Sequence, residues 1–344
     1  MKRKAGTRRV NLALQGGGSH GAFTWGVLDA LLEDRRLEFE GVTGASAGAM
    51  NAVVIADGWL DGLRARRDPR EAARAALKSF WDAVAAQPSV FALSSRWSGA
   101  SAGFPTHPLL VWYELLSQVL SPYQLNPLNF NPLRSVLEPS VDFERLRARS
   151  PFKLFVAATN VRTGRVRIFR EHELVLEMLL ASACLPFAFQ AVKVNGEHYW
   201  DGGYMGNPAL WPLWYATKAN DLVLVQINPL TRTDLPDTAQ EIIDRASEIS
   251  FNASLIHEMR SIEFVQRLLT ERRIDPKRYK RIHLHMIGAE ERMESFGQAS
   301  KYDTSRDFLA ELFTLGRATA QEWLEMKFAY LGHASTVRIA ETFL

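Results

Sequence analysis

A serine among small residues, in the motif Gly44-x-Ser46-x-Gly48, is the first residue that could perform chemistry. The motif lies between a predicted strand at residues 38–43 and a predicted helix at residues 47–56. On such a sharp turn a serine hydroxyl projects clear of the sheet edge, and small neighbours are needed because the backbone is crowded. The motif therefore predicts a nucleophilic serine. The alternative is a structural turn that is packed with small residues.

A run of glycines, residues 16–18, followed by Gly21, lies at a second predicted junction of strand and helix. Glycines in series leave backbone N–H groups unshielded, which suits an oxyanion hole or a phosphate cradle. The run also fits the dinucleotide motif G-x-G-x-x-G. That alternative requires an acidic residue at the end of the second strand, and Glu38 and Glu40 stand before the apolar part of that strand. The oxyanion interpretation is the better supported of the two.

A third motif, Asp201-Gly202-Gly203, directly follows a predicted strand at residues 197–200. On its own this tripeptide indicates a turn. Beside the other two motifs, an aspartate that ends a strand can present its carboxylate to a neighbouring strand end. An unperturbed carboxylate, with a pKa of about 3.9, is a poor base at neutral pH. We therefore expect burial to raise the pKa of Asp201, and expect kcat/KM to have an acid limb clearly above pH 4.

A Ser–His–Asp triad is the alternative to a serine–aspartate pair. In the order Ser…Asp…His, the histidine would follow Asp201 in the chain. The candidates are His257, His283, His285 and His333. None of them lies in a glycine-rich loop, so the pair is preferred.

Together the three motifs resemble those of the patatin-like phospholipase family, strongly over residues 10–207. The resemblance implies a three-layer α/β/α fold with a mostly parallel central sheet, and lipid acyl hydrolysis by a serine–aspartate dyad. It makes Ser46 the nucleophile and Asp201 the base. The remaining motif residues would be the oxyanion-hole donors Gly16, Gly17 and Gly18 and the supporting glycines Gly21, Gly44, Gly48, Gly202 and Gly203.

One residue departs from the family pattern. His20 stands where the family usually has arginine or lysine. A histidine there would make activity sensitive to pH, or would simply be packed at the start of a helix. The implied substrate is a phospholipid or another acyl ester, cleaved by phospholipase A or lysophospholipase chemistry with no metal and no cofactor. A catalytically silent lipid-binding protein is a further alternative, and the presence of both Ser46 and Asp201 argues against it.

The elements that must position these residues follow from hydrophobic patterning. A strand at residues 10–15, a helix at 21–33, and the strand and helix around Ser46 indicate a mostly parallel sheet with helices on both faces. The other elements predicted in this way are strands at 152–159, 166–169, 197–200, 221–227 and 281–287, and helices at 64–86, 238–269 and 305–330. We expect one domain over residues 1–344, with a C-terminal extension at 230–344 that packs on the core.

Residues 88–151 are rich in proline and aromatic residues. Because proline at that density interrupts helices and strands, we expect an irregular insertion with one short helix near 109–120. Its apolar side chains suit an acyl-chain groove or a lid, and an ordinary covering segment is an equal alternative. Residues 174–192 are too polar for a membrane span and predict a buried helix followed by a loop.

Composition narrows the classes further. With 344 residues, 47% hydrophobic and 23% charged, the chain is neither fibrous nor largely disordered. Its single cysteine, Cys184, excludes an intramolecular disulfide. A net charge of +3, with basic runs at 64–70 and 272–281, permits peripheral contact with an anionic membrane and gives little support to nucleic-acid binding. With no secretory signal visible, we expect a cytoplasmic protein; oligomeric state is not predicted.

Overall fold

An eight-stranded sheet forms the centre of the protein. The computed structural model describes residues 6–87 and 120–344. The strands are β1 (Arg8–Leu14), β2 (Leu37–Gly44), β3 (Lys153–Asn160), β4 (Val166–Arg170), β5 (Val192–Val194), β6 (Glu197–Asp201), β7 (Asp221–Val225) and β8 (His283–Ile287). Their order is β5-β6-β3-β2-β1-β7-β8, and β4 also pairs with β3. The strands β3, β2, β1, β7 and β8 run parallel to one another, whereas β4 and β6 pair with β3 in antiparallel fashion and β5 pairs with β6 in antiparallel fashion.

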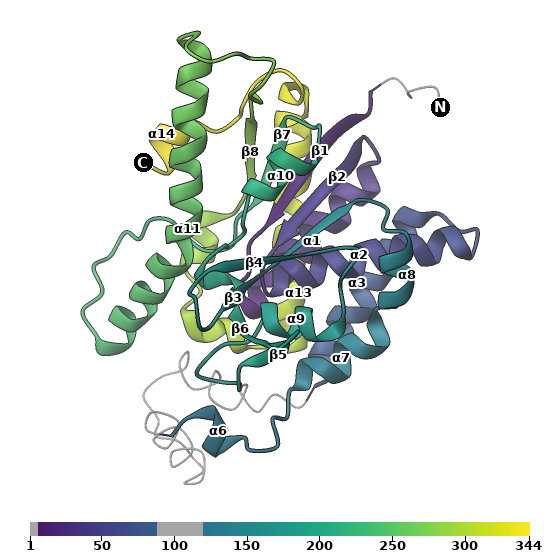
Figure 1. The fold of residues 1–344 in the computed structure, drawn as a ribbon, viewed down its shortest axis with the longest axis vertical. Helices are drawn as coiled ribbons and strands as arrows, with labels where there is room; N and C mark the ends of the chain where they lie inside the picture. Colours follow the sequence, from purple (N-terminus) through teal and green to yellow (C-terminus); the bar gives the residue numbers. More distant parts are fainter. Residues whose placement is uncertain (1–5, 88–119) are drawn as a thin grey trace.

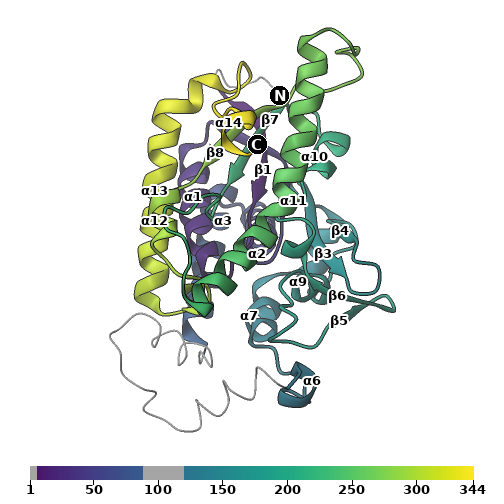
Figure 2. The same ribbon diagram turned by 90° about the vertical axis from the view of Figure 1, so that its left-hand side faces the viewer.

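Helices cover both faces of this sheet, which gives three layers α/β/α (Figures 1 and 2). The helices are α1 (Gly21–Asp34), α2 (Ala47–Arg64), α3 (Pro69–Ala86), α6 (Pro122–Leu125), α7 (Pro132–Ser140), α8 (Phe143–Ala148), α9 (Leu176–Ser182), α10 (Trp211–Ala216), α11 (Ala239–Thr270), α12 (Glu290–Glu294), α13 (Arg306–Lys327) and α14 (Ile339–Thr342). Short 3-10 turns are η1 (Gly18–His20), η2 (Gly202–Tyr204), η3 (Gln298–Tyr302) and η4 (Phe328–Tyr330). The expected fold class is confirmed.

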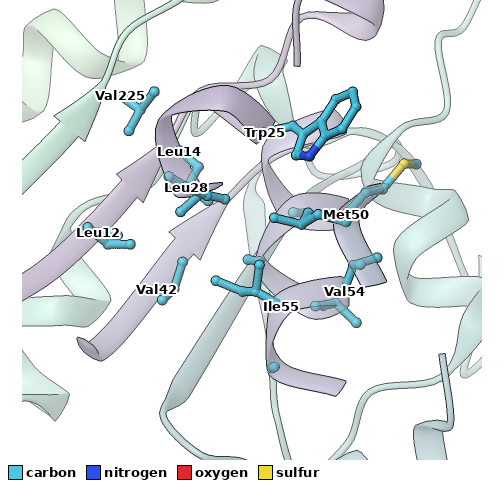
Figure 3. Close-up of a cluster of buried hydrophobic side chains, with 14 of the residues drawn as sticks. Leu12, Leu14, Trp25, Leu28, Val42, Met50, Val54, Ile55 and Val225 are labelled. Carbon is cyan, nitrogen blue, oxygen red and sulfur yellow. The ribbon is translucent and has the colours of Figure 1, made fainter. Parts of the chain in front are cut away.

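The alternation of β1 explains why both faces are covered. Successive side chains of a strand point to opposite faces. Val10, Leu12 and Leu14 are fully buried in the cluster that β1 forms with α1, α2, α3 and α13, whereas Ala13 belongs to the cluster under α10 and α11. Figure 3 shows the first cluster, in which side chains of α1 and α2 cover those of β1 and β2. This packing holds the strand-to-helix junctions together at the carboxyl ends of the parallel strands.

The C-terminal helix α13 packs closely against α1. A side chain at Gly316 would collide with the carbonyl oxygen of Phe23, and one at Gly26 would collide with that of Phe313. Arg317 also pairs with Asp29 of α1. The C-terminal residues therefore contact the N-terminal part of the sheet domain closely. The organisation of residues 1–344 as one domain stays a prediction.

The predicted strands and long helices are present, and most of their ends are shifted by a few residues. α2 continues eight residues beyond its predicted end at residue 56, and the helix predicted at 64–86 begins at Pro69. Residues 174–192 form the buried helix α9 and a loop, and the short strand β5 was not predicted. Residues 120–151 were expected to be irregular, but they hold the short helices α6, α7 and α8. Pro122 and Pro132 stand at the first position of α6 and α7, where a helix tolerates proline, and Pro139 lies within α7 near its end. Most of the helix predicted at 109–120, and much of the proposed groove or lid, lie outside the described residues.

Candidate active site

Ser46 occupies a strained turn between β2 and α2. Its backbone angles are φ 51° and ψ −126°, a conformation that non-glycine residues rarely adopt. The turn is possible because its neighbours lack side chains: a Cβ at Gly48 would collide with the carbonyl oxygen of Leu14, and one at Gly44 would lie 2.6 Å from the carbonyl carbon of Gly48. Ser46 is partly exposed while the residues on either side of it are buried. The predicted serine turn is therefore present.

The register of the sheet places Asp201 at the same end of the strands as Ser46. Gly44, at the end of β2, is paired with Val156 of β3. Two residues further along β3, Ala158 is paired with Asp201, the last residue of β6. The side chains of Ser46 and Asp201 form a hydrogen bond. The two residues, far apart in the chain, thus meet at the ends of β2 and β6, the two strands that flank β3.

The carboxyl group of Asp201 is almost completely buried, with 1% of the residue exposed. Burial raises its pKa from 3.8 to about 7. Three groups act in the opposite direction: the backbone N–H of Gly203, which donates to Oδ1 at 2.7 Å, the Ser46 hydroxyl and the charge of Lys301. The expected increase in the pKa of Asp201 is confirmed. A carboxyl group with a pKa near 7 can both accept and return a proton at neutral pH.

The last residue of α9 and the loop that follows it support both residues. The backbone N–H of Ser46 donates to the carbonyl oxygen of Ser182 at 3.1 Å and to its hydroxyl oxygen at 3.0 Å. The backbone N–H of Asp201 donates to the carbonyl oxygen of Cys184 at 2.8 Å. Reasoning from the sequence did not assign these residues a role.

The glycine loop lies directly beside Ser46. A Cβ at Gly16 would be 2.8 Å from Cβ of Ser46. The N–H of Gly16 is not free, because it donates to Oδ1 of Asn207 at 2.6 Å. In the part of the chain that the structure describes, the N–H groups of Gly17 and Gly18 have no hydrogen-bond partner. The set of available donors is therefore narrower than the expected three: Gly17 and Gly18 can receive an oxyanion, whereas Gly16 anchors the loop.

The other predicted glycines take supporting positions. Gly21 begins α1, Gly44 ends β2, Gly48 lies in the first turn of α2, and Gly202 and Gly203 belong to η2.

Buried amide side chains hold the glycine loop. Oε1 of Gln15 accepts the N–H groups of Ile227 and Asn228 at 2.9 Å each, and Nδ2 of Asn228 donates to the carbonyl oxygen of Gly16 at 2.9 Å. Asn207 holds the N–H of the same glycine. Sequence reasoning missed these residues. A usable signal was their position, since Gln15 and Asn228 are polar residues within three positions of the ends of two adjacent buried strands.

His20 is buried and bonded through Nε2 to the hydroxyl of Ser300 at 2.6 Å. Burial and the nearby charge of Lys301 hold the pKa of His20 well below its usual value of 6.5. The ring is therefore neutral at working pH. This supports the packed-histidine alternative over the pH-sensitive one.

The histidines of the alternative triad do not join the pair. His283 and His285 lie in β8 and contact Asp221 at the opposite end of the strands. Within residues 6–87 and 120–344, no hydrogen bond or ion pair links His257, His333 or these two to either motif residue. The same described ranges contain no group of three or more His, Cys, Asp or Glu side chains that could hold a metal ion.

A partly exposed serine on a strained strand-to-helix turn, bonded to a buried carboxylate beside free backbone donors, is typical of hydrolases that form an acyl-enzyme. The chain belongs to the patatin-like phospholipase family, whose model matches residues 12–214. Membership of this family favours the hydrolase interpretation over the dinucleotide-binding alternative. It also indicates action on lipid esters.

Comparison with individual proteins adds little. None of the curated proteins matches the sequence. A solved structure similar to this chain is VipD from Legionella pneumophila, with 15% identity and a TM-score of 0.44 over 94% of this chain and 69% of the VipD chain. At that similarity the pair supports no statement about function.

Proposed function

We propose that this protein is a lipid acyl hydrolase of phospholipase A or lysophospholipase type, in which Ser46 is the nucleophile and Asp201 its base. The observation that carries the proposal is the hydrogen bond between the Ser46 hydroxyl and a buried carboxyl group whose pKa is about 7. A weak nucleophile needs a base to remove its proton. A catalytically silent lipid-binding protein would need neither the strained backbone at Ser46 nor the burial of the Asp201 carboxyl group, which is unfavourable for its ionised form.

The geometry supports a two-step mechanism. Asp201 accepts the hydroxyl proton as Oγ of Ser46 attacks the ester carbonyl carbon. The oxyanion of the tetrahedral intermediate accepts hydrogen bonds from the N–H groups of Gly17 and Gly18. When the ester C–O bond breaks, the protonated Asp201 gives its proton to the leaving alcohol, and an acyl-serine remains. Asp201 then removes a proton from water, whose oxygen attacks the acyl carbon. When the bond from that carbon to Oγ breaks, the protonated Asp201 returns its proton to Oγ, and the fatty acid and the free serine are released.

Labelling with a fluorophosphonate probe tests the nucleophile. Ser46→Ala should abolish labelling and lower kcat by roughly 10³- to 10⁶-fold, because only the oxyanion donors and substrate binding remain. Ser140→Ala is the matched control, since this serine only donates to the carbonyl oxygen of Val136 at 2.6 Å. Labelling that persists in folded Ser46→Ala protein would place the nucleophile elsewhere.

The pH profile tests the base. Since Asp201 must be ionised to accept a proton and its pKa is about 7, kcat/KM should fall about tenfold for each pH unit below about 7. The profile is measured with a soluble ester so that lipid packing does not change with pH. A rate that is constant from pH 7 to pH 5 contradicts the role of Asp201.

The two basic runs lie away from the candidate site. Ser46 precedes the first residue of α2 and Arg64 is its last, so about 27 Å of helix separates them. The run 272–281 follows the end of α11, whereas Phe251 of that helix packs against Gly203 beside Asp201. Peripheral contact of these runs with an anionic membrane stays a prediction. Among the described residues, no helix is long and apolar enough to span a membrane; a cytoplasmic location stays a prediction.

A further inference from the structure

A segment from the C-terminal part of the chain covers the glycine loop. This segment, η3, lies outside the residues matched by the family model, 12–214. A Cβ at Gly18 would collide with the carbonyl oxygen of Lys301, so the two backbones are in contact. The hydroxyl of Ser300 is bonded to His20 at the end of the same loop. The loop is therefore enclosed by residues that are distant in sequence from every motif.

Lys301 connects this segment to the loop through one intermediate residue. Its Nζ donates to Oδ1 of Asn228 at 2.7 Å, and Nδ2 of Asn228 donates to the carbonyl oxygen of Gly16 at 2.9 Å. The ammonium group also lies 5.9 Å from the ring centroid of Phe251, and this ring packs against Gly203. One cation thus stands between the loop and the turn that carries Asp201.

We propose that Lys301 is a positioning residue of the active site: through Asn228 it holds the glycine loop beside Ser46, and it places a positive charge beside the turn that carries Asp201. The inference rests on the proposed hydrolase function. It assigns the C-terminal region a part in the reaction. No substrate contact is required of Lys301.

The charged groups around Lys301 do not cancel the effect of its positive charge on the carboxyl group of Asp201. Burial lowers the pKa of Lys301 to about 8, so the ammonium form predominates at pH 7. Glu248 and Asp244 attract this charge and Arg232 opposes it. Glu248 is itself paired with Arg232, which reduces its hold on Lys301.

The other titratable groups that face Asp201 are neutral at working pH. Burial raises the pKa of Cys184 and of Tyr204 to about 12 each, and also raises that of Tyr302. His20, the remaining titratable group near Lys301, is neutral as well. A change of charge at Lys301 should therefore be felt directly in the protonation of Asp201.

Three substitutions separate charge from hydrogen bonding. Lys301→Met removes both, Lys301→Gln retains a donor for Asn228, and Lys301→Arg retains the charge. Lys327→Met, at the far end of α13, is the matched control because it removes a lysine from the same region away from the site. For each protein we would measure kcat and the pH profile of kcat/KM with a soluble ester, the rate of fluorophosphonate labelling, and the thermal denaturation midpoint.

Lys301→Met should move the acid limb of kcat/KM to higher pH by about half a unit to one unit, because an opposite charge no longer favours the carboxylate. Its kcat should fall by up to about 100-fold as the loop loses its support. Lys301→Gln should show the same shift of the limb with a smaller loss of kcat. In Lys301→Arg and Lys327→Met, the acid limb of kcat/KM should lie at the same pH as in the wild-type protein.

An acid limb that is unchanged in folded Lys301→Met and Lys301→Gln proteins overturns the inference and leaves Lys301 a structural residue. If Lys301→Met does not fold, the comparison of Lys301→Gln with Lys301→Arg decides, since these two differ in charge while both can donate. A wild-type protein that neither hydrolyses esters nor reacts with the probe instead contradicts the proposed function itself.

Discussion

Replacing Asp201 with asparagine should make the protein more stable at alkaline pH. The carboxyl group is 1% exposed, and burial raises its pKa from 3.8 to about 7. A rise of about three pKa units corresponds to about 4 kcal/mol of unfavourable free energy for the ionised form in the folded state. Asparagine carries no charge and can still accept the N–H of Gly203, so it avoids this cost.

The size of the stabilisation by Asp201→Asn depends on pH. Between about pH 4 and pH 7 the folded wild-type protein binds a proton that the unfolded chain has already released, so the contribution of Asp201 to stability falls as pH rises through this window. Above about pH 7 the full cost is present. The free energy of unfolding of Asp201→Asn should exceed that of wild type by about 4 kcal/mol at pH 8.5 and by less than about 2 kcal/mol at pH 5.

Urea unfolding of both proteins at the two pH values measures this difference. Asp221→Asn is the matched control: this buried carboxylate accepts from Gly332 at 2.8 Å, contacts His285, and has a lowered pKa. Its replacement should destabilise the protein at pH 8.5. If Asp201→Asn has the same advantage at both pH values, or is less stable than wild type at pH 8.5, the carboxyl group does not bear the cost inferred from its burial.

Two further substitutions test the support of the site and the fold. Asn207→Ala should lower kcat by up to about 100-fold in a folded protein that still labels at the serine, because the glycine loop loses one anchor; an unchanged kcat in a steady-state assay contradicts that role. Gly316→Ala should lower the free energy of unfolding in urea by roughly 1–3 kcal/mol, because a Cβ there would collide with the carbonyl oxygen of Phe23. Gly297→Ala, where a Cβ meets nothing within 4 Å, is its control and should change that energy by less than about 0.5 kcal/mol. Equal effects of the two would refute the close packing of α13 on α1.

The sequence alone determined most of the elements that flank the site, and the identity of the motif residues. The serine turn could be predicted because it depends on residues within two positions of Ser46, whose small size permits its backbone angles. Strands and helices could be predicted because burial imposes a period on the apolar residues of each segment. The raised pKa of Asp201 could be anticipated as well, since its chemistry requires it.

Only the tertiary structure decided which groups complete the site. Gly16 and Asn207 are 191 residues apart, and Gly16 and Asn228 are 212 apart. Their hydrogen bonds, like that of Lys301 to Asn228 across 73 residues, follow no sequence period. They exist because the order and register of the strands bring loop ends together, and because a side-chain hydrogen bond depends on a few tenths of an ångström that local patterning does not specify. For the same reason, the glycine of the loop whose N–H is occupied could be identified only after the chain was folded.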